Sequence, residues 1–257
     1  MKSLWNSFKI AFSMFSKIPV PQAEWTEENM KYMLCFFPFI GTAIGIVFLV
    51  AEWICRYLGF GNSFTAMVLV LVPVILTGGI HIDGLLDTSD ALSSWQERTR
   101  RLEILKDSHA GAFAIITACV YFILWLGAWR QLLGDHDGIC IMSIGFMMSR
   151  CLSGIGVIIF PKARTDGTVA EFSRNASEIV ARNVLVMMFA ALAVLMIWIN
   201  PVRGVLAAGT ALLVFWWYHH MAMKYFGGTT GDLSGFFLCI CEVVMALVLG
   251  VTGIVVL

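Results

Sequence analysis

Three aspartates, Asp83, Asp87 and Asp90, lie four and three residues apart in the stretch GGIHIDGLLDTSD. Each residue of a helix turns by about 100°, so the spacing places the three carboxylates on one face within about 60° of arc. Carboxylates that close repel one another unless a cation lies between them, and oxygen ligands favour a hard cation such as Mg²⁺. The pattern predicts a magnesium site in which all three acids are metal ligands and catalytic groups. The alternative is a solvated loop whose acids balance the basic run after it.

A basic stretch, ERTRRLEILKDSHAG, follows the aspartates. Guanidinium and ammonium groups bind phosphate oxygens, which predicts contacts to a phosphorylated substrate here. The candidate phosphate ligands are Arg100, Arg101, Lys106 and Ser108. Glu103 and Asp107, again four residues apart, offer either further catalytic acids or ion-pair partners for these cations. A network of surface salt bridges is the alternative for the whole stretch.

Two later polar segments carry further candidates. The stretch PKARTDG contains Arg164, a candidate phosphate ligand, although basic residues after an apolar run are common. In YFGGTTGDLSG, Gly228 and Thr230 would turn a backbone N–H group and a hydroxyl toward a phosphate. Asp232 would then be a further metal ligand. The alternative is a glycine-rich turn that only connects two helices.

Two charged residues, Arg150 and Glu242, fall inside apolar stretches. Ionisable groups at that depth are usually paired or functional. The sequence leaves two alternatives open: they pair with each other, or they face the acidic site. In the second case Arg150 is a candidate ligand for substrate phosphate.

The composition decides which solvent surrounds these residues. Of 257 residues, 59% are hydrophobic and 13% are charged, whereas soluble domains carry about 25% charged residues. Apolar runs long enough to cross a bilayer recur along the chain. We therefore predict one all-α, polytopic membrane domain, residues 1–257, that contacts the lipid bilayer. The net charge is zero, so nothing points to nucleic acid as a partner.

About seven transmembrane helices are expected, with an N-terminal helix in addition. The spans are predicted at residues 35–58, 64–80, 112–131, 138–160, 183–199, 204–223 and 236–257. Within residues 1–22, apolar side chains recur at helical spacing with Lys9 and Lys17 between them. This pattern favours an amphipathic helix lying in the membrane interface, and an ordinary buried amphipathic helix is the alternative.

Lysines and arginines predict the orientation, because they are enriched in cytoplasmic segments. With a cytoplasmic N-terminus, thirteen of the 17 lie on the cytoplasmic side and three on the other. Residues 81–111, 161–182 and 224–235 then share one face, the cytoplasmic one, and would form the catalytic segments.

The segments resemble the signature of cobalamin-5′-phosphate synthases, also called adenosylcobinamide-GDP ribazoletransferases. GGIHIDGLLDTSDAL followed by RRLEILKDSHAGAFA carries the most specific part of the likeness. FSKIPVP, FPFIGTAIG, PKARTDG and GGTTGD agree in order, so the resemblance covers nearly the whole chain.

The resemblance implies the last assembly step of the cobalamin coenzyme, in the cytoplasmic (inner) membrane of a prokaryote. Adenosylcobinamide-GDP would be the donor and α-ribazole or its 5′-phosphate the acceptor, with GMP leaving. A pyrophosphate donor of this kind needs Mg²⁺ to neutralise its oxygens. Asp83 or Asp107 would accept the hydroxyl proton. The oligomeric state stays open, with a homo-oligomer among the alternatives.

Two other classes of membrane protein compete with this interpretation. CDP-alcohol phosphotransferases and prenyltransferases also bind Mg²⁺ through aspartates, but their patterns DGxxAR…GxxxDxxxD and NDxxxD are absent from this sequence. An ion-coupled transporter would usually place its charges near the bilayer midplane and between repeats. Here the charges gather toward one membrane face and no repeat is visible.

Overall fold

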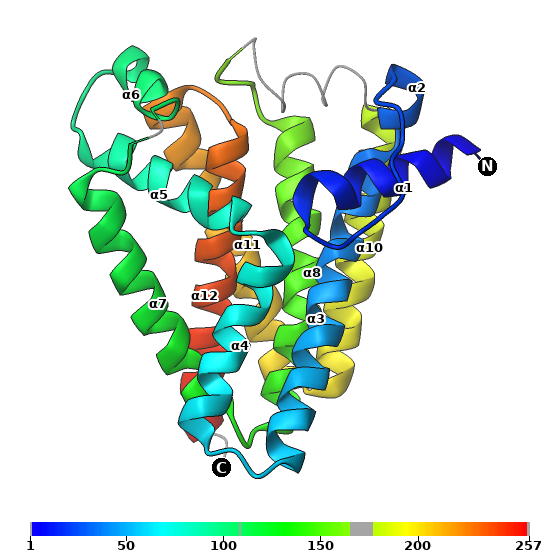
Figure 1. Ribbon diagram of the computed structural model, residues 1–257, viewed down its shortest axis with the longest axis vertical. Helices are drawn as coiled ribbons and strands as arrows, with labels where there is room; N and C mark the ends of the chain where they lie inside the picture. The colour runs from blue at the N-terminus through cyan, green and yellow to red at the C-terminus, as the bar shows by residue number, and fades with distance from the viewer. Residues whose placement is uncertain (1, 108, 165–176, 256–257) are drawn as a thin grey trace.

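The computed structural model describes residues 2–107, 109–164 and 177–255. Most of these residues are helical (Figure 1). The helices are α1 (Lys2–Phe15), α2 (Glu27–Met30), α3 (Met33–Tyr57), α4 (Asn62–Thr77), α5 (Ile80–Ser93), α6 (Arg98–Ile104), α7 (Ala112–Leu132), α8 (His136–Ile159), α10 (Glu178–Ile199), α11 (Pro201–Phe226) and α12 (Gly231–Val255). One isolated bridge, between Lys162 and Thr229, is the only β pairing in the described part. The all-α prediction is confirmed.

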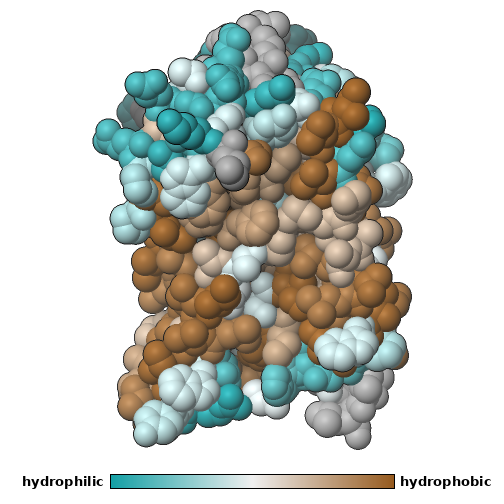
Figure 2. Space-filling view, turned by 90° about the vertical axis from the view of Figure 1, so that its right-hand side faces the viewer, coloured by the Kyte–Doolittle hydropathy of each residue, from teal (hydrophilic) through white to brown (hydrophobic). Residues whose placement is uncertain are grey.

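The long helices form an upright bundle with a broad apolar belt between two polar ends (Figures 1 and 2). Among the described residues, α3, α7, α8, α10 and α12 are long and apolar enough to cross a membrane. Helices α4 and α5 form a sixth candidate that is bent by 93°. The remaining predicted span lies in α11, a helix of 26 residues that packs against α10 and α12. The polytopic architecture is therefore confirmed.

Two consecutive glycines produce the bend between α4 and α5. Gly78 and Gly79 have φ angles of 66° and 80°, a region that residues with a Cβ atom rarely adopt. Helix α5 consequently turns away from the span and lies across the end of the bundle (Figure 1). We treat residues 80–93 as lying outside the membrane-spanning segments.

Helices α5 and α12 approach each other closely through two further glycines. A Cβ atom on Gly84 would lie 2.5 Å from the backbone oxygen of Asp232, and one on Gly235 would lie 3.1 Å from that of His81. A Cβ atom does not fit at Gly84, and one at Gly235 would require its neighbours to shift by a few tenths of an ångström. The contact holds the acidic face of α5 beside the first turn of α12.

Helix α1 also lies across this end of the bundle (Figure 1). It buries Ile10, Ala11 and Phe12 and packs against α3, while Leu4 and Trp5 stay exposed. An N-terminal helix is confirmed over Lys2–Phe15, and the apolar side chains of its second half pack on the protein. Its placement in a membrane interface stays a prediction.

Candidate active site

Polar segments that are far apart in the sequence meet at one end of the bundle (Figure 1). Helix α5 packs against α12, and α6 contacts both α5 and α11. The loops before α10 and α12 join through two backbone hydrogen bonds, from Ala163 N to Thr229 O (3.0 Å) and from Thr229 N to Pro161 O (2.8 Å). The predicted convergence of these segments is thus observed. Ser108, a candidate phosphate ligand, and residues 165–176 lie outside the described residues.

The acids of α5 form a cluster of negative charge with Asp232 and Asp107. Asp87 is half-buried, and burial raises its pKa. The negative charges of Asp83, Asp232, Asp90 and Asp107 add to the effect, and together they raise the pKa of Asp87 to about 7. A shift of this kind means that a cation or a proton stabilises the cluster.

A magnesium ion fits this cluster in one specific mode. No three His, Cys, Asp or Glu side chains among the described residues converge enough to hold a metal ion by themselves. Mg²⁺, however, typically takes one or two carboxylates and completes its octahedral shell with waters and substrate phosphate. Asp83 and Asp87 supply oxygen donors and have no ion-pair partner within the described part of the chain. The residues present therefore suit a metal ion that is shared with a phosphorylated substrate.

Asp90 has a contact that its spacing did not indicate. Its carboxylate accepts hydrogen bonds from the backbone N–H groups of Gly111 (2.6 Å) and Ala114 (2.8 Å), at the start of α7. A helix leaves these N–H groups without internal partners, and its dipole favours an anion there. Asp90 therefore caps α7 across 21 residues of sequence.

The acids around α6 pair with their neighbours in the sequence. Arg100 donates to Glu103 at 2.7 Å, and both side chains are exposed. Asp107 accepts a hydrogen bond from the backbone N–H of His109 (3.0 Å) and lies 2.8 Å from its ring nitrogen Nδ1. These hydrogen bonds hold the pKa of Asp107 below its usual value. The ion-pair alternative from the sequence describes Glu103, whereas Asp107 bonds His109, which is outside the predicted set of cations.

Two candidate phosphate ligands connect α6 with the rest of the site. Arg101 is buried, with its guanidinium carbon 4.7 Å from the ring centroid of Tyr225, a cation–π contact. Arg164 donates to a backbone carbonyl of α6, and its charge attracts the carboxylate of Asp232. Lys106 is exposed and already takes part in an interaction. Arg164 is the cation placed nearest the acid cluster by these contacts.

The glycine-rich loop positions α12. A Cβ atom on Gly228 would overlap the backbone oxygen of Pro161, so the close approach that this glycine permits is to protein backbone. Thr230 Oγ1 accepts a hydrogen bond from the N–H of Leu233 at 3.2 Å and caps the helix. The loop therefore places Asp232 against α5. Direct phosphate contacts from Gly228 and Thr230 stay predictions.

The charges inside the bundle pair with each other. Arg150 on α8 donates to Glu242 on α12 at 2.7 Å, and Ser149 donates to the same carboxylate oxygen at 2.8 Å. Arg150 and Glu242 are 1% and 4% exposed, so the pair is sealed from solvent. The sequence left open whether Arg150 and Glu242 pair with each other or face the acidic site, and in the structure they pair. The prediction that Arg150 binds substrate phosphate is therefore corrected: Arg150 connects α8 with α12.

A cavity of about 130 Å³ opens beside the acids. Asp83 and Asp232 lie on its polar side, and His81 and Ser153 lie deeper among apolar side chains of α1, α3, α8 and α12. The sequence indicated neither His81 nor Ser153. His81 could have been found by its place in GGIHIDG, two residues before Asp83, whereas no local pattern marks Ser153.

Comparison with known proteins supports one family. A family model described as cobalamin-5-phosphate synthase matches residues 7–250. A relative from Lachnoclostridium phytofermentans, named adenosylcobinamide-GDP ribazoletransferase, is 45% identical over 242 residues, 94% of this chain and 92% of the relative. Relatives with the same name from Desulfitobacterium hafniense and Geobacillus thermodenitrificans are 33% and 30% identical, each over 91% of both chains. No solved structure matches the chain.

Proposed function

The chain belongs to the cobalamin-5-phosphate synthase family, and we propose that it joins adenosylcobinamide-GDP to α-ribazole or its 5′-phosphate and releases GMP. The observation that carries the proposal is the family match over residues 7–250, which contain every segment of the site. The relatives at 45% and 33% identity carry this activity in their names. The acid cluster supports the proposal, because its carboxylates suit the Mg²⁺ ion that a pyrophosphate donor requires.

The reaction joins an alcohol to a phosphorus atom. A ribose hydroxyl oxygen of the acceptor attacks the cobinamide-side phosphorus of the pyrophosphate, the bond to the bridging oxygen breaks, and GMP leaves with the bonding electrons. We assign the hydroxyl proton to Asp83, because its side chain lines the cavity where the acceptor would enter. Asp107 is a poorer candidate, since its carboxylate is hydrogen-bonded to His109.

We assign Mg²⁺ binding to Asp87 and Asp232, with Asp83 beside them. When bound, the ion neutralises the pyrophosphate oxygens and stabilises the leaving GMP. Arg164, next to Asp232, would clamp a phosphate oxygen from the other side. The protein then contributes position and charge, which suits phosphoryl transfer, because the donor already holds the activated bond.

The activity test uses the purified full chain in lipid nanodiscs. With adenosylcobinamide-GDP, α-ribazole and Mg²⁺ we expect release of GMP and a corrinoid product that contains the base. Omitting α-ribazole measures hydrolysis of the donor alone. Absence of GMP release with all components present overturns the proposed function.

We also propose that the site faces the cytoplasm of a bacterial membrane, because thirteen of the 17 lysines and arginines fall in the sequence segments assigned to that side. The relatives are bacterial, and the apolar helices support a multi-pass membrane protein.

Two exposed positions at opposite ends of the bundle, Gln96 and Ser63, test the orientation. In a variant without its native cysteines, S63C should react with an impermeant thiol reagent in intact cells, and Q96C should react only in opened cells. The reverse pattern contradicts the orientation.

A further inference from the structure

The cavity beside the acid cluster has mostly apolar walls. Helices α1, α3, α5, α8 and α12 surround it, and Figure 1 shows these helices meeting near the site end. Phe15 and Phe37 contribute aromatic rings, and Leu34, Val157 and Leu238 complete the apolar lining. The metal and phosphate assignments above use only its rim, where Asp83 and Asp232 lie, so its interior has no role in them.

Two residues that line the cavity each carry a buried polar atom without a hydrogen-bond partner among the described residues. His81 Nε2 and Ser153 Oγ are sealed from solvent and have no hydrogen-bond partner within the described part of the chain. The two residues are 9% and 1% exposed and both line the cavity. Buried polar atoms without partners are destabilising, and they are rare unless a ligand or an ordered water meets them. A ligand that fills this cavity is therefore expected to carry a hydrogen-bonding atom on an otherwise apolar body.

We propose that the cavity binds the aromatic base of the acceptor nucleoside, an inference that rests on the function proposed above. The base of α-ribazole is a flat benzimidazole with two methyl groups. One ring nitrogen is bonded to the ribose, and the other keeps a lone pair that accepts a hydrogen bond. Phe15 and Phe37 provide surfaces for the ring, and Ser153 or His81 donates to the free nitrogen. The ribose then lies at the rim, beside Asp83.

Other occupants fit the same lining less well. The corrin ring of the donor is far larger than a cavity of about 130 Å³. Guanine presents several donors and acceptors along its edge, and the apolar lining would leave most of them without partners. A lipid acyl chain would fill the apolar part, but it would leave His81 and Ser153 without hydrogen bonds.

The first test removes one hydroxyl. S153A should raise KM for α-ribazole about three- to tenfold, the usual effect of one hydrogen bond, with kcat and the KM for adenosylcobinamide-GDP unchanged. S143A is the matched control, because Ser143 lies on the same helix, is also buried, and bonds only the carbonyl of Cys140. It should leave all three constants unchanged. A KM for α-ribazole that is unchanged in S153A, or is raised equally in S143A, contradicts the assignment.

The second test uses the wild-type protein and needs no variant to fold. Free dimethylbenzimidazole should inhibit competitively against α-ribazole and not against the donor. Benzimidazole without the two methyl groups should bind about tenfold more weakly, because less apolar surface is buried. V157F, which fills the cavity, should abolish this inhibition. Inhibition that is insensitive to the methyl groups and to V157F overturns the proposal.

These outcomes separate the two levels of inference. If the wild-type protein releases no GMP, the proposed function fails and the base assignment fails with it. If GMP is released while both tests are negative, only the base assignment fails. A lipid that copurifies with the wild-type protein and is lost in V157F, with unchanged KM for α-ribazole, assigns the cavity to an acyl chain and also overturns the proposal.

Discussion

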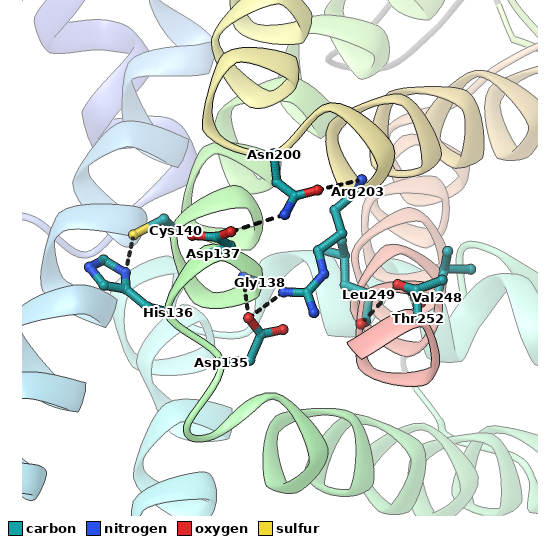
Figure 3. Close-up of polar contacts among 10 residues, drawn as sticks. All are labelled: Asp135, His136, Asp137, Gly138, Cys140, Asn200, Arg203, Val248, Leu249 and Thr252. Atoms are coloured by element: carbon teal, nitrogen blue, oxygen red, sulfur yellow. Dashed lines mark hydrogen bonds and ion pairs between the residues drawn. The ribbon is translucent and has the colours of Figure 1, made fainter. Parts of the chain in front are cut away.

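At the end of the bundle opposite the site, the carboxylates are held by partners (Figure 3). Arg203 forms an ion pair with Asp135, and Asn200 donates to Asp137 at 3.0 Å. Asp135 also accepts from the N–H of Gly138 at 3.1 Å and so caps α8. At the site end, Asp83 and Asp87 have no ion-pair partner among the described residues, and the pKa of Asp87 is raised to about 7.

The difference separates two uses of the same residue type. The acids of the far end connect the start of α8 with the turn between α10 and α11, where Arg203 compensates the charge of Asp135 and the side-chain amide of Asn200 donates to Asp137. Asp83 and Asp87 of α5 have no compensating cation among the described residues. A protein that keeps such a cluster half-buried forgoes stability there, which is common at functional sites. Substitutions at the two ends should therefore affect different properties.

The largest expected effect is on turnover at the site end. D87N should lower the rate of GMP release about 100-fold, because an uncharged amide is a weak Mg²⁺ ligand. D232N should act in the same direction and raise the Mg²⁺ concentration needed for half-maximal rate. Steady-state rates across a Mg²⁺ series check both variants. A near-normal rate for D87N at limiting Mg²⁺ would contradict metal binding and favour the alternative that these acids are only a solvated surface.

D87N, which should lower the rate, should raise the stability of the metal-free protein at high pH. Asp87 has a pKa of about 7 in the folded protein and an ordinary value of 3.8, so folding takes up a proton between these values. Stability of the metal-free protein then declines as pH rises from about 4 to about 7. D87N should remove this decline and be the more stable protein at pH 8, with little difference near pH 4. Thermal unfolding in a chelator at both pH values measures it, and lower stability of D87N at pH 8 contradicts it.

The next largest effect is on stability at the far end. D135N keeps the shape of the side chain but leaves Arg203, whose side chain is 7% exposed, without its counter-charge. The expected loss is about 2–3 kcal/mol, below that for a fully buried pair because Asp135 is partly exposed. Turnover at 25 °C should stay within about twofold. Denaturant unfolding measures the expected loss of stability, and GMP release measures the expected turnover. A large loss of turnover without a loss of stability would show that this network takes part in the reaction.

A smaller effect is expected for Asp90, which shares a helix face with Asp87 but caps α7. D90N retains one acceptor oxygen and loses the charge at the helix start, so about 1 kcal/mol of stability should be lost. The rate should fall only a few-fold, and its Mg²⁺ dependence should match wild type. A loss as large as that of D87N, with a shifted Mg²⁺ dependence, would make Asp90 a metal ligand as its spacing predicted.

The smallest effect is expected for Glu103. Its pair with Arg100 is exposed, and exposed pairs contribute about 0–1 kcal/mol. E103Q should leave both unfolding and GMP release close to wild type. A rate loss above about tenfold would restore Glu103 as a catalytic acid.

Much of the architecture followed from local patterns. Long apolar runs predicted the spanning helices, because each satisfies its own backbone hydrogen bonds in lipid. The sharp bend between α4 and α5 likewise has a local cause, since it depends only on the φ angles of Gly78 and Gly79. The one-sided charge distribution predicted which segments converge. The carboxylates of α5 were recognisable in the same way, since helical spacing alone places Asp83 and Asp87 on one face.

The sequence by itself determined that this is a membrane protein, where its helices lie and which segments carry its chemistry, because these properties depend on composition and short-range spacing. The tertiary structure decided which charges find partners, because those partners are distant in the chain. Arg150 and Glu242 are 92 residues apart, and Asp90 reaches the start of another helix. His81 and Ser153 became neighbours of one cavity only when α5 and α8 packed around it.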